Sequence, residues 1–373
     1  MTRFLSMHRV GMLAVTLFVG FAPTLFAQTI TTFDVPNSTS TQPSAINAAG
    51  QIAGSYSDGL GQHGFLRQAD GTTASFDAPY PFQPGGPPVQ TGATSINVAG
   101  QITGYVYHPT DVSFGFLRHT DGTFVVFGAG RSGGADCLGV TENAFTALTV
   151  PTGLVQFEGT VPAAINNSGQ IAGACSANTG LDAGTPVGFL RQRDGSIVRF
   201  AVPTTGVGNP WTRALAVNSR GQITGDYCCT PPRDYHAFLR EPDGTITTFD
   251  ANSLSGQSTT PIAINPRGQI TGYAGNDGFL RQPDGSIVIF DGPNSTSTQS
   301  TAINSKGQIT GVYLDASNIY HGFLREKHGS MTTVDVPNAS STYPTGINPR
   351  GNITGWYSDA TGVHGFVYVA SEK

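Results

Sequence analysis

The chain has 373 residues, with 19 basic and 24 acidic side chains and a net charge of −5 at neutral pH. Only 12% of the residues are charged. The sequence therefore lacks the strongly basic face on which nucleic-acid binding depends, and no nucleic-acid partner is expected. Abundant Gly, Ser, Thr and Asn favour short strands and tight turns over helices.

The first 27 residues have the composition of a secretory signal peptide. Arg3 and Arg9 precede an apolar run that reaches Phe26, and the small residue Ala27 stands at the expected cleavage point. The run is short for a transmembrane anchor, and no later segment is long and apolar enough to span a bilayer. We therefore expect an exported protein, periplasmic or extracellular, whose mature chain 28–373 forms a single domain without a membrane span.

The mature sequence is repetitive. FDVPNSTSTQPSAIN at 33–47 returns as FDGPNSTSTQSTAIN at 290–304, identical at 12 of 15 positions. Both copies lead into the phrase I-N-x-x-G-Q-I-x-G, which occurs seven times with small changes. Its asparagines are Asn47, Asn97, Asn166, Asn218, Asn265, Asn304 and Asn348. Each copy is followed by G-F-L-R or a close variant, and most then carry D-G-[TS] and an alternating run ending in Phe.

Each repeat predicts four short strands in chain order. The first ends at Ile-Asn, the second is Q-I-x-G-x-Y, the third is H-G-F-L-R and the fourth follows the D-G pair. Asn-x-x-Gly between the first two strands fits a type I turn followed by Gly at positive φ, and Asp-Gly joins the last two strands in the same way. A period of about 40–50 residues with four antiparallel strands is typical of a β-propeller blade.

The two ends of the chain favour a ring over an open β array, which would need capping repeats. The seventh repeat stops after its third strand, and the mature chain begins with a lone fourth strand, TITTFD at 29–34. A strand from one end can therefore complete the repeat at the other end. The sequence predicts an all-β protein, a seven-bladed β-propeller of four-stranded antiparallel blades closed by the strand at 29–34.

Repeats that combine H-A-F or H-G-F, a D-G turn and I-N-x-x-G-Q-I-x-G, with HAF itself at 236–238, resemble the bacterial extracellular HAF-repeat family. The resemblance covers nearly the whole mature chain. It implies an exported, propeller-like protein and carries over no established activity and no catalytic residues. The sequence departs from the family pattern at Phe114, Val187 and Asp277, where the histidine is replaced.

An insertion at 128–162 follows the second repeat, and the latter part of this segment predicts a β-hairpin. Its first residues, GAGRSGG at 128–134, match both G-x-G-x-x-G and G-x-S-x-G. Those motifs need a helix after the turn, as in dinucleotide-binding and hydrolase folds, whereas this one follows the fourth strand of a β repeat. We therefore expect no cofactor and no catalytic residue there.

Histidines recur at one repeat position, as His63, His236, His321 and His364. They are either converging metal ligands or residues that hydrogen-bond within their own repeats. The local role is favoured because Phe114 and Val187 replace His in other repeats. The spacings H-x-H and H-E-x-x-H do not occur, so no metal site is predicted.

The long, irregular segments join second to third strands and one repeat to the next, and all of them would lie on one face, here called the loop face. Variable loops on a rigid scaffold are the usual place for function. The candidate ligand-binding residues there are Tyr56, Tyr227, Tyr313, Trp356, Tyr357 and Trp211. These aromatic residues either pack at the blade edges or form a platform for sugar rings or peptides.

Two functions follow from these patterns. In the favoured hypothesis the protein is a non-catalytic exported propeller that binds a glycan, a peptide or another cell-surface component through the loop face. The alternative is a secreted polysaccharide lyase or hydrolase with its site on the loop face near the central channel. Such an enzyme would need two carboxylates or a His–Tyr pair within about 10 Å.

The cysteines are Cys137, Cys175, Cys228 and Cys229, and export permits disulfides. The loop assignment places all four in one sector of the loop face. A bridge between the adjacent pair would join Cα atoms about 3.8 Å apart, below the usual minimum of roughly 4.4 Å. We therefore expect the insertion cysteine and Cys175 each to bond one member of the adjacent pair, ahead of an adjacent bridge.

Overall fold

The computed structural model describes residues 29–80, 89–107, 113–128, 159–176, 186–204, 211–228, 234–251 and 258–370. All regular elements in these ranges are β-strands. The predicted signal peptide lies outside the described residues, as does most of the predicted insertion, including its hairpin. In the ranges that are described, no helix is long and apolar enough to cross a membrane.

The strands follow the four-strand repeat that the sequence predicts. The first strands are β2 (Ser40–Ile46), β6 (Gln90–Ile96), β10 (Thr160–Ile165), β14 (Trp211–Val217), β18 (Thr259–Ile264), β22 (Ser295–Ile303) and β26 (Ser341–Ile347). The second strands are β3 (Ile52–Ser57), β7 (Ile102–Tyr107), β11 (Ile171–Ser176), β15 (Ile223–Cys228), β19 (Ile270–Ala274), β23 (Ile309–Asp315) and β27 (Ile353–Ser358). The third strands are β4 (Gln62–Arg67), β8 (Ser113–Arg118), β12 (Pro186–Arg191), β16 (Tyr235–Arg240), β20 (Asp277–Arg281), β24 (Tyr320–Arg325) and β28 (Val363–Val369). The fourth strands are β5 (Thr73–Phe76), β9 (Phe124–Phe127), β13 (Ile197–Phe200), β17 (Ile246–Phe249), β21 (Ile287–Phe290) and β25 (Met331–Val334), and β1 (Thr29–Phe33) precedes them all.

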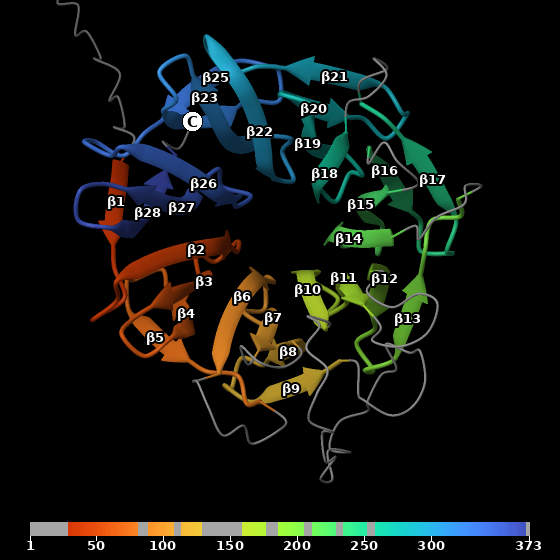
Figure 1. Ribbon diagram of the computed structural model, residues 1–373, viewed down its shortest axis with the longest axis horizontal. Coiled ribbons are helices and arrows are strands. Elements are labelled where there is room, and N and C mark those ends of the chain that lie inside the picture. Colours follow the sequence, from red (N-terminus) through yellow and green to blue (C-terminus); the bar gives the residue numbers. More distant parts are fainter. Residues whose placement is uncertain are drawn as a thin grey trace, which may run out of the picture.

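Consecutive strands pair antiparallel in five four-stranded sheets, and the remaining strands form one eight-stranded sheet. In the eight-stranded sheet, a single parallel pair, Ser40 with Val363, joins β2–β5 to β26–β28. β1 pairs antiparallel with β28 along its whole length. The N-terminal strand therefore completes the sheet of the last three strands, as predicted. Figure 1 shows the sheets arranged around a central axis, with the first strand of each nearest the centre and β1 beside β28.

The repeated asparagine does more than make a turn. The Oδ1 of Asn47 accepts hydrogen bonds of 3.0 Å from the backbone of Ala49 and Gln51, while Gly50 takes φ 85°. Its Nδ2 donates to the carbonyl oxygen of Asn97 in the next sheet, 3.0 Å away. Each of the seven asparagines does the same to the next, and Asn348 donates to Asn47, with distances from 2.9 to 3.3 Å. The seven residues thus form a closed cycle of buried hydrogen bonds.

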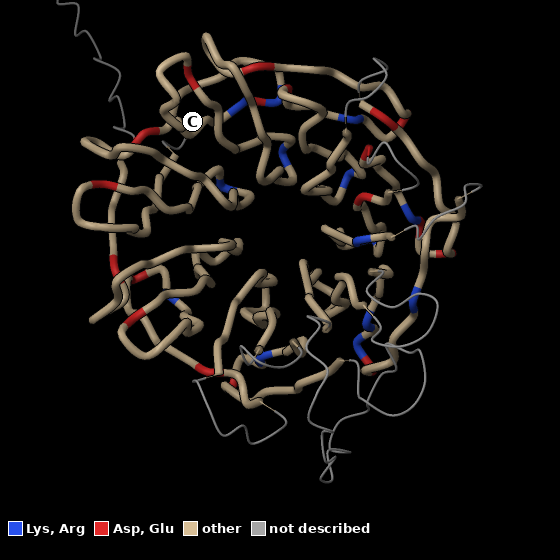
Figure 2. The backbone as a smooth tube through the Cα atoms, in the orientation of Figure 1, with Lys and Arg blue, Asp and Glu red and all other residues tan. Residues whose placement is uncertain are grey.

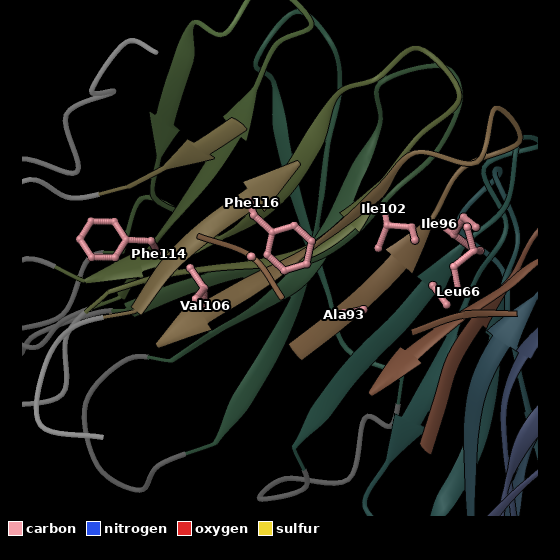
Figure 3. Close-up of a cluster of buried hydrophobic side chains, with 9 residues drawn as sticks. Leu66, Ala93, Ile96, Ile102, Val106, Phe114 and Phe116 are labelled. Atoms are coloured by element: carbon pink, nitrogen blue, oxygen red, sulfur yellow. The ribbon is translucent and has the colours of Figure 1, made fainter. Parts of the chain in front are cut away.

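The core lies between neighbouring sheets. In Figure 3, Leu66 of β4 lies beside Ile96 of the following sheet, in one buried cluster with Ile102 and Phe116. The phenylalanine of each G-F-L-R or equivalent phrase is at most 1% exposed, and burial of such a ring stabilises the fold by about 1.5–3 kcal/mol. At Gly64 a Cβ would overlap the ring of Phe76 on the fourth strand, so glycine lets that ring pack closely there. The repeated phrase is therefore a packing motif.

The position of the arginine in G-F-L-R suggests the aspartate of its own turn as a partner. In the structure the arginine instead stacks on a phenylalanine. The guanidinium of Arg67 lies 4.7 Å from the ring centroid of Phe33 on β1, which pairs with the last repeat. Asp70, in the turn, instead accepts hydrogen bonds from the backbone and the hydroxyl of Thr72. The same stacking joins Arg118 to Phe76, Arg191 to Phe127, Arg240 to Phe200, Arg281 to Phe249 and Arg325 to Phe290. These contacts are cation–π interactions between repeats.

Candidate functional site

The repeat histidines have local partners, as their sequence position predicts. The Nδ1 of His63 lies 2.8 Å from Asp77, at the end of the fourth strand, and its Nε2 lies 3.3 Å from Asp58 in the preceding loop. Burial by itself lowers the pKa of His63, but the two aspartates outweigh it and the pKa is raised. The histidine is thus held between two carboxylates of its own repeat.

The arrangement recurs in three other repeats. Nδ1 contacts the aspartate after the fourth strand at 2.9 Å for His236, 2.7 Å for His321 and 2.9 Å for His364. For His364 that aspartate is Asp34, which follows β1, so the contact ties the N-terminal strand to the last sheet. In the described ranges, no group of three or more His, Cys, Asp or Glu side chains is placed to hold a metal ion.

Four of the predicted ligand-binding tyrosines pack against these histidines. Ring centroids are 5.1 Å apart for Tyr56 and His63, 5.5 Å for Tyr227 and His236, 5.1 Å for Tyr313 and His321, and 5.2 Å for Tyr357 and His364. Tyr313 is only 6% exposed. Each pair belongs to its own repeat, so the structure does not bring these four tyrosines together. A ligand-binding role for them stays a prediction.

The two predicted tryptophans lie in separate aromatic groups. The Trp211 ring meets Tyr235 edge-on at 5.2 Å, and the guanidinium of Arg213 lies 4.7 Å from its centroid. Trp356 stacks on Tyr343 at 3.9 Å with an interplanar angle of 15°. Figure 1 places the strands of the two groups, β14 and β26, on opposite sides of the central axis.

In every repeat, residues of constant type flank the first-strand position that Arg213 and Tyr343 occupy. In every repeat the first strand carries a threonine that is at most 3% exposed, namely Thr41, Thr91, Thr160, Thr212, Thr259, Thr298 and Thr342. In six repeats its Oγ1 accepts a hydrogen bond of 2.8–3.1 Å from the backbone of the segment linking the repeats. Two residues later, the strand faces an invariant glycine of the second strand. At Gly225 a Cβ would overlap the carbonyl oxygen of Arg213, so only glycine fits.

Between these fixed positions lies one cross-strand pair whose chemistry differs in every repeat. We call these residues the variable pairs. They are Gln42–Ser55, Gly92–Tyr105, Val161–Ala174, Arg213–Asp226, Thr260–Tyr273, Gln299–Val312 and Tyr343–Trp356. Because the neighbouring positions on both sides are fixed by packing and hydrogen bonds, this is the place where the repeat tolerates chemical change. The variable pairs lie toward the loop-face ends of the inner two strands and form the candidate functional site.

The pair in the β14–β17 sheet is ionic. Arg213 donates from Nε to Oδ1 of Asp226 at 3.0 Å and from Nη2 to Oδ2 at 2.6 Å. The aspartate side chain is fully buried, whereas 42% of the arginine side chain is exposed. Hydrogen bonding of the guanidinium to the Asp226 carboxylate is the main cause that raises the pKa of Arg213. The guanidinium is consequently fixed in orientation and presented to solvent. Figure 2 shows this basic position on β14, a strand next to the centre of the ring.

The sequence patterns found Trp211 and Trp356 but missed Arg213, Asp226 and Tyr343. Alignment of the seven repeats position by position would have revealed them. The residue after the fixed threonine and its partner on the second strand form a different combination in every repeat, and that irregularity is the signal.

Cys175, in β11, and Cys228, in β15, are 2% and 4% exposed in neighbouring sheets. Cys137 and Cys229 lie outside the described residues. The cysteine pairing therefore stays a prediction.

No protein-family model and no curated protein matches the chain. Among solved structures, virginiamycin B lyase from Staphylococcus aureus superposes with a TM-score of 0.55 and 12% identity over 92% of this chain and 100% of that one. The β-propeller domain of the Trilobed protease from Pyrococcus furiosus gives 0.55 and 8%, covering 90% and 97%. Oligogalacturonate lyase from Vibrio parahaemolyticus gives 0.52 and 11%, covering 93% and 98%.

At these identities the similarity defines the fold alone. The chain is an all-β protein with the fold of the β-propellers, built from four-stranded antiparallel sheets.

Proposed function

We propose that the protein is an exported, seven-bladed β-propeller of the HAF-repeat type that acts as a non-catalytic binding module through its loop face. The count of seven treats the eight-stranded sheet as two blades, β2–β5 and β26–β28 with β1. It is supported by the closed cycle of seven asparagine hydrogen bonds. The signal-like N-terminus and the HAF pattern support export and the family.

The observation that carries the binding function is the set of variable pairs. A fold that needed one residue at this position would repeat it, as it repeats the adjacent threonine and glycine. The side chains of Gln42, Val161, Arg213 and Gln299 are partly or largely exposed there. An array of unlike polar, charged and aromatic groups on one rigid frame suits recognition of an extended ligand such as a glycan, a peptide or an envelope component.

The enzyme alternative is less well supported. A His–Tyr pair at 5.1 Å exists on the loop face, as the enzyme hypothesis requires. The same pair recurs in four repeats, and the histidine in each is engaged by an aspartate of the fold. One structural role repeated four times explains this better than a catalytic site. Two of the similar structures are named as lyases, but identities of 11–12% transfer no chemistry.

The test is capture of ligands by a variant that keeps the frame. The chain offers a substitute pair, Thr260–Tyr273, which can be copied into two other repeats as Arg213→Thr with Asp226→Tyr and as Tyr343→Thr with Trp356→Tyr. We expect immobilised wild-type protein to retain components of cell-envelope extracts or glycan arrays. The variant with all four substitutions, called the fourfold variant, should retain at least about tenfold less material.

The matched control is Arg220→Gln, an exposed residue in a tight turn on the opposite face. It should retain ligand like the wild type. Equal capture by wild type and fourfold variant would contradict the proposal, as would release of products from any polysaccharide that the protein binds.

A further inference from the structure

The ionic variable pair is unusual for its position. None of the other six pairs carries a charge, so the blade folds without one. A buried carboxylate with an arginine partner is at best a small contributor to stability compared with apolar residues of similar size. Asp226 is nevertheless fully buried beneath the exposed Arg213. The ion pair is better explained by what it presents than by what it stabilises.

The ion pair leaves the outer edge of the Arg213 guanidinium, here called the fork, free for a ligand. The two bonds to Asp226 occupy Nε and one Nη2 hydrogen. Both Nη1 hydrogens and the second Nη2 hydrogen remain, and in the described residues they have no hydrogen-bond partner. This outer edge has the geometry that binds a carboxylate through two parallel hydrogen bonds. Because Asp226 already fixes the side chain, little rotamer entropy is lost when a ligand binds.

Aromatic groups flank the fork. Trp211 covers one face of the guanidinium, and Tyr235 packs edge-on against Trp211. The backbone of Tyr235 is tied to the next sheet through Ser258 Oγ at 3.1 Å. After Asp226, Tyr235 and Tyr273 also raise the pKa of Arg213 through their charge. The surroundings thus combine ring surfaces with hydroxyl groups that can donate or accept hydrogen bonds.

Resting on the binding function proposed above, we infer that Arg213 receives the carboxylate of a uronate residue in an acidic polysaccharide. A uronate combines a carboxylate for the fork with a pyranose ring for Trp211 and Tyr235 and hydroxyls for the phenols. The net charge of −5 gives no general attraction for polyanions, so recognition depends on this oriented fork.

The test uses oligogalacturonate as the probe and its fully methyl-esterified form as the matched ligand, which keeps the ring but removes the charge. Isothermal titration should show binding of the acid to the full-length mature protein and a loss of about tenfold or more in affinity for the ester. Arg213→Lys keeps the charge without the fork and should lose about tenfold. The double variant Arg213→Thr with Asp226→Tyr should abolish binding, and Arg220→Gln should leave it unchanged.

Equal affinity for acid and ester, or full binding by the double variant Arg213→Thr with Asp226→Tyr, would overturn the inference. Absence of oligogalacturonate binding in wild type would also overturn it. If wild type then still captures neutral glycans or peptides, with capture lost on changing Tyr343 and Trp356, the proposed binding function survives and only the uronate assignment fails. Preference for peptides ending in acidic residues, lost in Arg213→Lys, would replace the polysaccharide with a protein ligand.

Discussion

The cycle of asparagine hydrogen bonds makes a quantitative prediction for Asn304→Ala. The Asn304 side chain is 4% exposed and makes four hydrogen bonds. Its Nδ2 donates to Gln308 Oε1 at 2.7 Å and to the carbonyl of Asn348 at 3.0 Å, and its Oδ1 accepts from two turn amides at 3.0 Å. After the substitution the Asn348 carbonyl keeps its hydrogen bond from the Gly351 amide at 3.0 Å, so the loss is that of the four Asn304 bonds.

A hydrogen bond contributes about 1 kcal/mol net, and the exposed turn amides can bond to water after the substitution. The loss of the four bonds should therefore reduce the free energy of unfolding by about 2–4 kcal/mol. Equilibrium unfolding in urea, followed by tryptophan fluorescence, measures it from the shift in midpoint at an unchanged slope. Lys306→Ala, in the same turn but exposed, is the control and should change stability by less than about 0.5 kcal/mol. A loss below about 1 kcal/mol for Asn304→Ala would refute the reasoning.

Three further predictions follow from the same contacts. The pKa values of His63, His321 and His364 are raised by their aspartates against the opposing effect of burial, so the charged form stabilises the fold. That contribution is complete below the unfolded-state pKa of about 6.5 and is lost as pH rises through the folded-state values. Urea midpoints should fall from about pH 6 to about pH 8, less steeply in His364→Gln, and a rise would contradict the assignment. Removing residues 1–34 leaves the β28 edge open, so the chain should aggregate or unfold at lower urea and recover when the peptide TITTFD is added; unchanged stability would argue against β1 as a structural strand. Thiol titration of the unreduced, denatured protein should find no free thiol, and four free thiols would exclude the predicted disulfides.

Repetition made most of the fold predictable. One phrase seen seven times reveals its turns, because Asn and Gly recur at the spacing of a tight turn, and it reveals its strands through alternation. The pairing of β1 with β28 was also predictable, since one end of the chain lacked the strand that the other end supplied.

Partners in neighbouring sheets were not predictable in the same way. The phenylalanine that stacks on Arg67 belongs to another repeat, whereas Asp70 is close in sequence but is already bonded to Thr72. Asn47 was explained fully by its own turn, and nothing in one repeat shows that its amide also reaches Asn97. Local sequence patterns determine the contacts within a repeat, whereas contacts between repeats depend on how the sheets pack against one another.

The candidate site was only half visible for the same reason. Trp211 and Trp356 stood out by residue type. Arg213 and Asp226 are 13 residues apart and meet only through the register of β14 and β15. The tyrosines at the end of the second strand each pack against the histidine across the strand pair, a contact that the sequence did not reveal, and their ligand-binding role stays a prediction.

The central claim is that ligand binding takes place at the variable pairs. Hydrogen exchange, followed by mass spectrometry with and without the captured ligand, tests it most directly. We expect slower exchange at the loop-face ends of the inner two strands, around Arg213, Asp226, Tyr343 and Trp356, with no change in the asparagine turns on the opposite face. Protection confined to those turns, or to the outer strands, would contradict it.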